Sequence, residues 1–235
     1  MKNWYFIYLV VFTVAVASFQ ACSDDETGNP ELSDFTDQLT NQIDEVILPT
    51  VASYKTEMAN FESTSESVTS PMDEVALSSL RNAFQNAYMN YQSIAMHDYF
   101  ANSSLNLVKF SNLYPIEVDI LENLIETGSR DFNSSNHERA NGFPAIDYML
   151  YGPSDVIAFF NEDDKRLSFL KALITNMKER ADNLDTQWNS LRDAFVEADG
   201  VSKGSAISGQ LNGSSAYYEF SIREDKVGIP IGRLG

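Results

Sequence analysis

One short segment holds the residues whose types and spacing best suit binding chemistry. It reads GFPAIDYMLYG, runs from Gly142 to Gly152, and places a single carboxylate, Asp147, among apolar residues and phenols. Pro144 stands near the start of the segment, and proline is favoured in the first turn of a helix. We therefore expect a short helix with Asp147 on its first turn, where free backbone amides attract negative charge.

Two interpretations of this segment stay open on the residues alone. In the first, burial holds the Asp147 carboxylate ready for a cation or a polar ligand. Gly142, Pro144 and Gly152 would then shape the turn, and Tyr148 and Tyr151 would line the cavity. In the second, the segment is a tightly packed helical turn that plugs one end of a bundle, with Asp147 as a capping residue.

Other familiar catalytic patterns are missing from the sequence. Its only histidines are His97 and His137, without an HExxH motif or a His/Cys cluster, and no GxSxG motif is present. These facts argue against a standard zinc hydrolase and against a serine triad. Carboxylates are plentiful, and Glu122 and Glu126 share a helix face at a spacing of four. Hard cations prefer such oxygens, although a solvated acidic face is the commoner explanation.

The first 21 residues have the layout of an export signal. Lys2 precedes an apolar run that is too short for a comfortable membrane span, and Ala21 stands directly before Cys22, the only cysteine of the chain. This arrangement is typical of a lipobox, with Phe19 in the place where leucine is usual. We therefore expect residues 1–21 to be a lipoprotein signal peptide and Cys22 to be lipidated.

The residues after Cys22 are acidic, as is the whole chain. Residues 22–32 read as a flexible acidic tether, and its Ser23-Asp24-Asp25-Glu26 run resembles a surface-export signal of lipoproteins. We expect a lipid anchor in the outer membrane, on the periplasmic face or at the cell surface. The net charge of −18 argues against a nucleic acid partner, because phosphate binding needs clustered Lys and Arg.

Helical periodicity dominates the remainder, residues 33–235. A heptad-like stripe predicts a helix over about 163–198, and a second stripe predicts a helix that begins after Ser70-Pro71. A third predicted helix leads from Phe35 to Phe61 and should kink at Pro49, and a weaker one covers about 205–225. The clearest stripe consists of Leu170, Ile174, Met177, Ala181, Leu184, Trp188, Leu191 and Phe195.

These patterns predict an all-α fold, an antiparallel helical bundle, because long helices with narrow apolar stripes must pack side by side. Residues 101–162 differ from the rest. They are rich in Asn, Ser, Gly and Pro and predict a long irregular crossover, which is often functional. The crossover contains the GFPAIDYMLYG segment.

The segment resembles the signature turn of the imelysin-like family, the insulin-cleaving peptidase family of bacterial envelopes. The family pattern is Gly-x-His-x-x-Glu, so that Gly142 matches, Pro144 replaces His and Asp147 replaces Glu. One branch of the family has a similar Gly-Phe-Pro-Ala-Ile-Asp/Glu form. The tail KVGIPIG at residues 226–232 looks like the family's late KxGxPxG segment.

The resemblance covers roughly residues 33–235 and implies two helical bundles with the signature near their junction. Members usually continue into more helix after the KxGxPxG segment, so we expect a chain that is short at its C-terminus. A proline side chain cannot bind metal, which leaves Asp147 as the only metal ligand from this motif. The resemblance therefore favours a binding protein, for iron, another cation or a small ligand, that works with envelope uptake proteins. A metallopeptidase and a structural or adhesive surface lipoprotein are the alternatives.

Overall fold

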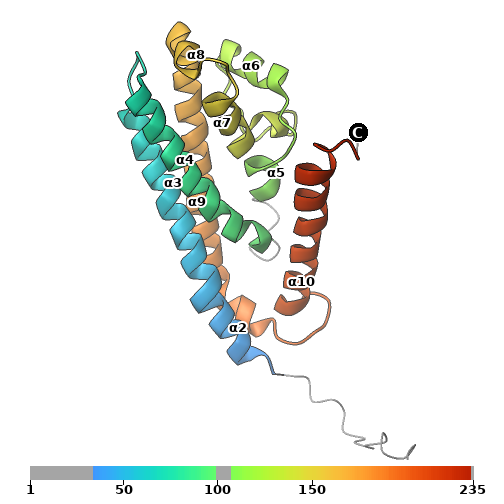
Figure 1. The fold of residues 1–235 in the computed structure, drawn as a ribbon. Coiled ribbons are helices and arrows are strands. Elements are labelled where there is room, and N and C mark those ends of the chain that lie inside the picture. The colour runs from blue at the N-terminus through green and yellow to red at the C-terminus, as the bar shows by residue number, and fades with distance from the viewer. Residues whose placement is uncertain (1–33, 99–106, 234–235) are drawn as a thin grey trace, which may run out of the picture. The chain divides into compact units, whose positions relative to one another are not determined.

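In the computed structural model, residues 34–98 and 107–233 can be described, and they contain helices and loops without a strand. Contacts within the chain divide it into Met1–Asp34 and one compact unit, Phe35–Gly235. Figure 1 shows three long helices, α3, α4 and α9, packed side by side within this unit. The predicted all-α bundle is therefore confirmed.

The longest helix is α9, Asp164–Glu197, and it agrees closely with the predicted span. Asp163 caps its N-terminus by accepting a hydrogen bond from the Lys165 amide. All stripe residues of this helix are buried except Leu191, which is half-buried. Since burying one large apolar side chain contributes about 1.5–3 kcal/mol, the stripe decides which face of α9 meets the core.

Helix α4, Glu74–Ile94, begins after Asp73, whose side chain accepts from the Ala76 amide. The buried residues of α4 are those of the predicted second stripe: Leu77, Leu80, Phe84, Ala87, Tyr91 and Ile94. A 3-10 turn, η2, follows at Ala95–His97. Helix α4 and helix α9 both pack against α3, Leu48–Ser67, which therefore forms the middle of the bundle.

Helix α3 continues an N-terminal helix α2, Thr36–Gln42, through a π-helical stretch η1, Ile43–Ile47. The π-helical stretch ends just before Pro49, which has no amide proton for the carbonyl four residues earlier. The sequence predicted a kink here, and the structure shows this change of helix type. Asp44 of η1 forms an ion pair with Arg192, and Lys55 of α3 forms one with Asp185, in the order that antiparallel helices give.

The predicted irregular crossover contains more regular structure than its composition suggested. It includes four short helices: α5 (Leu107–Ser111), α6 (Val118–Thr127), α7 (Gly142–Tyr151) and α8 (Val156–Glu162). A 3-10 turn, η3, at Glu138–Ala140 precedes α7. Helix α7 packs against α4 and α9, so the crossover covers one side of the three-helix core.

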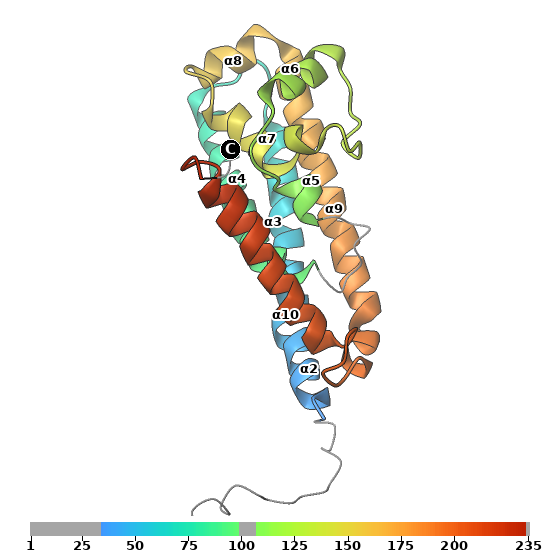
Figure 2. The ribbon, with the colours of Figure 1, turned by 90° about the vertical axis from the view of Figure 1, so that its right-hand side faces the viewer.

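The last helix of the described residues is α10, Ala206–Ala216, which continues as the π-helical stretch η4, Tyr217–Gly228 (Figure 2). The weak helix predicted over about 205–225 is thus present and slightly longer. Its contact with the core includes the turn η2. Among the helices of the described part of the chain, none is long and apolar enough to cross a membrane. The predicted signal peptide, Cys22 and tether lie outside the described residues.

Candidate functional site

The GFPAIDYMLYG segment forms helix α7, and Asn141 caps the N-terminus of this helix. The Asn141 Oδ1 accepts a hydrogen bond from the Gly142 amide at 2.7 Å, and its Nδ2 donates to the Phe132 carbonyl at 2.6 Å. Asparagine is a preferred N-cap, so this boundary was readable in the sequence. The expectation that Asp147 caps the helix or lies on its first turn is wrong, because α7 begins at Gly142 and Asp147 is its sixth residue.

Gly142 lets helix α7 start in direct contact with helix α5. Its φ of +66° lies in the left-handed region, which favours glycine, and a Cβ there would overlap the Ser111 carbonyl group and stand 2.6 Å from the Ser111 Cα. The two backbones can therefore approach only because residue 142 has no side chain. The buried Phe143 and Pro144 follow directly and enter the core.

The structure gives the polar side chains of α7 different surroundings. Tyr151 is partly exposed and faces α4, where the Arg81 guanidinium carbon lies 4.7 Å from its ring centre. Tyr148 is half-buried, and burial together with the charge of Glu122 raises its pKa. Gly152 ends the helix at the surface.

Asp147 lies on the exposed side of α7, yet the pKa of its carboxyl is raised, because the surrounding chain removes part of its water. Within residues 34–98 and 107–233 it forms no hydrogen bond or ion pair. Its charge instead helps to raise the pKa of the Tyr114 phenol, for which burial is the main cause. Asp147 is thus a partly desolvated carboxylate next to a phenol.

Tyr114 belongs to a polar cluster that the sequence did not reveal. Lys226, the first residue of the KVGIPIG tail, donates from its Nζ to the Tyr88 hydroxyl at 3.1 Å. The same ammonium lies 5.4 Å from the ring centre of Tyr88 and 5.7 Å from that of Tyr114. Tyr88 in turn donates to Asn112 Oδ1 at 3.4 Å. We call Tyr88, Asn112, Tyr114, Asp147 and Lys226 the motif cluster.

The loop that carries Tyr114 is fixed by a guanidinium. Arg139 donates from Nη1 to the Tyr114 carbonyl and, at 3.2 Å, to the Pro115 carbonyl. The Glu117 amide donates back to the Arg139 carbonyl at 2.7 Å. This loop therefore holds Tyr114 near the start of α6. There the Tyr114 side chain is close to Asp147 of α7 and to Lys226 of the tail.

A resident metal ion does not fit the motif cluster well. Among the described residues no group of three or more His, Cys, Asp and Glu side chains could hold a metal. The cluster offers one carboxylate and two phenols, and the Lys226 ammonium beside them opposes a bare cation by Coulomb repulsion. The chemistry of this donor set suits a polar molecule that presents both acceptor oxygens and positive or hydrogen-bonding groups.

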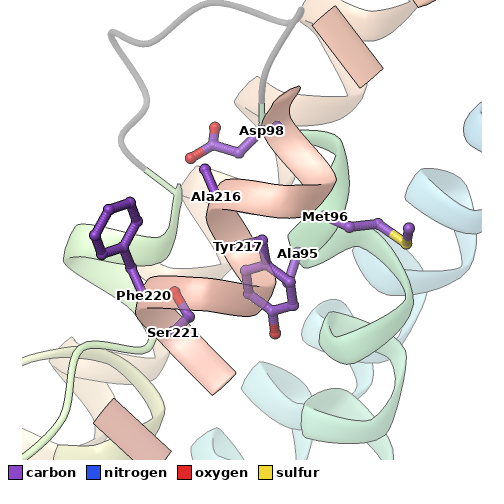
Figure 3. Close-up of a pocket in the computed structure, with 8 residues that line it drawn as sticks. Ala95, Met96, Asp98, Ala216, Tyr217, Phe220 and Ser221 are labelled. Carbon is purple, nitrogen blue, oxygen red and sulfur yellow. The ribbon is translucent and has the colours of Figure 1, made fainter. Parts of the chain in front are cut away.

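A pocket lies where the turn η2 meets the C-terminal helix (Figure 3). Tyr217 lines this pocket, and burial together with Tyr88 of the motif cluster raises its pKa to about 12. The Tyr217 hydroxyl donates to Gln92 Oε1 at 3.3 Å. The pocket is lined by Ala95, Met96, Asp98, Gly213, Ala216, Tyr217, Phe220 and Ser221.

Fold and site together define a helical protein in which a signature turn and a C-terminal tail meet at one polar cluster. The chain belongs to the Imelysin family, whose model matches residues 47–234. Its fold is similar to that of an imelysin-like protein from Psychrobacter arcticum 273-4, with a TM-score of 0.69 and 13% identity over 84% of this chain. The chain spans 63% of that protein's length. No curated protein matches.

Proposed function

We propose that this chain is a lipid-anchored binding protein of the cell envelope that takes a small polar ligand during uptake. The first candidate ligand is a complex of ferric iron with an organic chelator. The observation that carries the proposal is that the two family motifs meet at Tyr114. The charge of Asp147, from the signature turn, helps to raise the pKa of Tyr114, and the Lys226 ammonium, from the tail, lies 5.7 Å from its ring centre. Two segments that are far apart in the sequence thus bring charged side chains to one phenol, and a few convergent polar groups are typical of ligand sites.

The chemistry of the motif cluster explains why a chelate suits it better than a bare ion. Asp147 and the phenols offer hard oxygen atoms, which ferric iron prefers, but they are too few to complete its coordination. An anionic chelator supplies the missing oxygens and can accept hydrogen bonds from Lys226 and the protonated phenols. An unpaired, partly desolvated carboxylate at Asp147 gains from any cationic or hydrogen-bond-donating group of the ligand.

The anchor is a separate part of the proposal. The leader and Cys22 support cleavage and lipidation, which would hold the mature chain in the outer membrane next to uptake proteins. We expect labelled palmitate to enter the wild-type protein and to be absent from Cys22→Ser. Equal labelling of both proteins would contradict lipidation at this residue.

Ligand binding is tested by thermal melting of the wild type with ferric citrate, citrate alone, calcium or zinc. We expect stabilisation by ferric citrate, amounting to about 2.7 kcal/mol at 100 times the dissociation constant. The shift should be lost in Asp147→Asn and in Lys226→Met, which remove one charge each from the motif cluster. It should persist in Asp119→Asn and Lys203→Met, whose parent residues are exposed elsewhere.

Two outcomes would contradict the proposal. If no probe shifts a cooperative melt, the chain has no site for these ligands and a structural surface role becomes the better explanation. If zinc alone stabilises, and cleavage of a protein substrate is stopped by a chelating agent, the metallopeptidase interpretation returns. Such an enzyme needs an open metal with about three protein ligands, which the described residues do not supply.

A further inference from the structure

Several buried polar side-chain atoms have no hydrogen-bond partner within the part of the chain that the structure describes, among them Gln92 Nε2 and Gln187 Oε1 of half-buried residues, and four of these atoms belong to fully buried residues. The four are Tyr54 Oη, Tyr91 Oη, Ser111 Oγ and Asn112 Nδ2. Each of these four residues is at most 1% exposed. Buried polar groups in native proteins are almost always paired, and exceptions point to a bound water or ion. Four such atoms in one region are therefore unusual.

The residues that carry these atoms lie around Phe143. The ring centres of Tyr54 and Tyr91 lie 6.5 Å and 5.1 Å from that of Phe143, and 5.9 Å from each other. Ser111 is in backbone contact with the neighbouring Gly142. Asn112 accepts from Tyr88, whose ring centre lies 4.9 Å from that of Phe143. Helices α3 and α4 and the C-terminal end of α5, with Asn112 directly after it, thus bring the four residues to one region of the bundle.

A buried positive charge lies in the same region. Arg180 on α9 is 8% exposed and forms no ion pair with any described residue. Its guanidinium lies 4.8 Å from the ring centre of Phe110, which directly precedes Ser111. It donates to Asn176 Oδ1, to Asn133 Oδ1 and to the Phe132 carbonyl. These neutral acceptors orient the guanidinium but leave its charge uncompensated.

The groups share one chemical property, which is that they can all donate. The Asn112 Nδ2 and the guanidinium are donors only, and burial raises the pKa values of Tyr54 and Tyr91, so that both phenols keep their protons. The charge of Arg180 lowers the pKa of Tyr54, by less than burial raises it. Two carboxylates outside the group also have an effect: the charge of Asp98 helps to raise the pKa of Tyr91, and the charge of Glu179 raises that of Arg180, by less than burial lowers it.

We propose that these donors form an internal site for one small monovalent anion, of the size of chloride or nitrate. The site shares Asn112 with the motif cluster and adjoins it at Tyr91, whose ring centre lies 6.4 Å from that of Tyr88. An anion there would accept from the hydroxyl and amide groups and would balance the buried guanidinium. The residues of this anion site are Tyr54, Tyr91, Ser111, Asn112 and Arg180.

The test is thermal melting of the full protein at constant ionic strength, with sodium gluconate replaced stepwise by sodium chloride or sodium nitrate. Gluconate is too large for a buried site of this kind. We expect a saturable rise in melting temperature for the wild type. Loss of one hydrogen bond to a charged ligand should weaken the apparent affinity by about tenfold in Tyr54→Phe and in Tyr91→Phe.

Arg180→Gln should abolish the anion response. The matched control is Arg166→Gln, since Arg166 is on the same helix and its guanidinium likewise lies over a ring, 4.2 Å from the centre of Phe159. If Arg180→Gln does not fold, the two Tyr→Phe variants decide, because each removes a single atom. An anion response that is equal in the wild type and both variants would overturn the proposal. An absent response of the wild type would also overturn it, and a Tyr54→Phe protein that then melts above the wild type would identify the hydroxyl as truly unpaired.

Discussion

Gly142→Ala is expected to destabilise the protein by about 2–5 kcal/mol, because the new methyl group meets two separate obstacles. The first is the left-handed backbone at φ +66°, which residues with a Cβ rarely adopt. The second is steric, since the methyl carbon would overlap the Ser111 carbonyl group and lie 2.6 Å from the Ser111 Cα. These are backbone atoms, so relief requires that α5 and α7 move apart.

Gly128→Ala is the matched control for this prediction. Gly128 has a similar φ of +71° at the end of helix α6, but no atom lies within 4 Å of the place that a Cβ would take there. It therefore isolates the conformational cost of about 1–2 kcal/mol. Melting temperatures measure the difference, at about 2–4 °C per kcal/mol for a chain of this size. Equal losses in the two variants would mean that the contact of Gly142 with Ser111 is not tight.

Phe143→Ala is expected to cost about 3–5 kcal/mol, the usual range for deleting a fully buried aromatic ring. Phe143 is 0% exposed and lies within 6.5 Å, centre to centre, of four aromatic rings. Those rings come from α3 and α4 and belong to Tyr54, Phe84, Tyr88 and Tyr91. Two of these residues belong to the proposed anion site and one to the motif cluster, so the cavity should weaken binding at both.

Phe220→Ala provides the comparison for Phe143→Ala. Phe220 is 62% exposed on the C-terminal helix, and a surface substitution there should change stability by no more than about 0.5 kcal/mol. Chemical denaturation of the two variants gives the difference directly. A loss for Phe143→Ala as small as that for Phe220→Ala would show that helix α7 is not an integral part of the core.

The long helices were predictable because their information is local. A stripe of apolar residues at helical spacing must be buried, and in α4 and α9 nearly every predicted residue is. Asp73 and Asp163 are ordinary N-cap residues that mark where these helices start. The family resemblance was likewise carried by short segments, GFPAIDYMLYG and KVGIPIG, and the family model confirms it.

The position of Asp147 shows where local reasoning failed. Pro144 suggested a helix start that left Asp147 on the first turn, yet Asn141 caps the helix and α7 begins with Gly142. Asn141 was a readable signal for the helix start, because asparagine is a preferred N-cap residue. Why glycine is needed at residue 142 was not readable, because the clash is with Ser111, which is distant in the sequence.

The sequence by itself determined which long helices form, which faces they bury and which family the chain resembles, because periodicity, caps and short motifs are local properties. Only the tertiary structure decided that Lys226 meets Tyr88, 138 residues away, and that Tyr54 and Arg180 share one region of the core. No spacing rule connects such residues. They come together because burial of the apolar stripes sets the register of the helices, and the polar groups between the stripes are carried along with it.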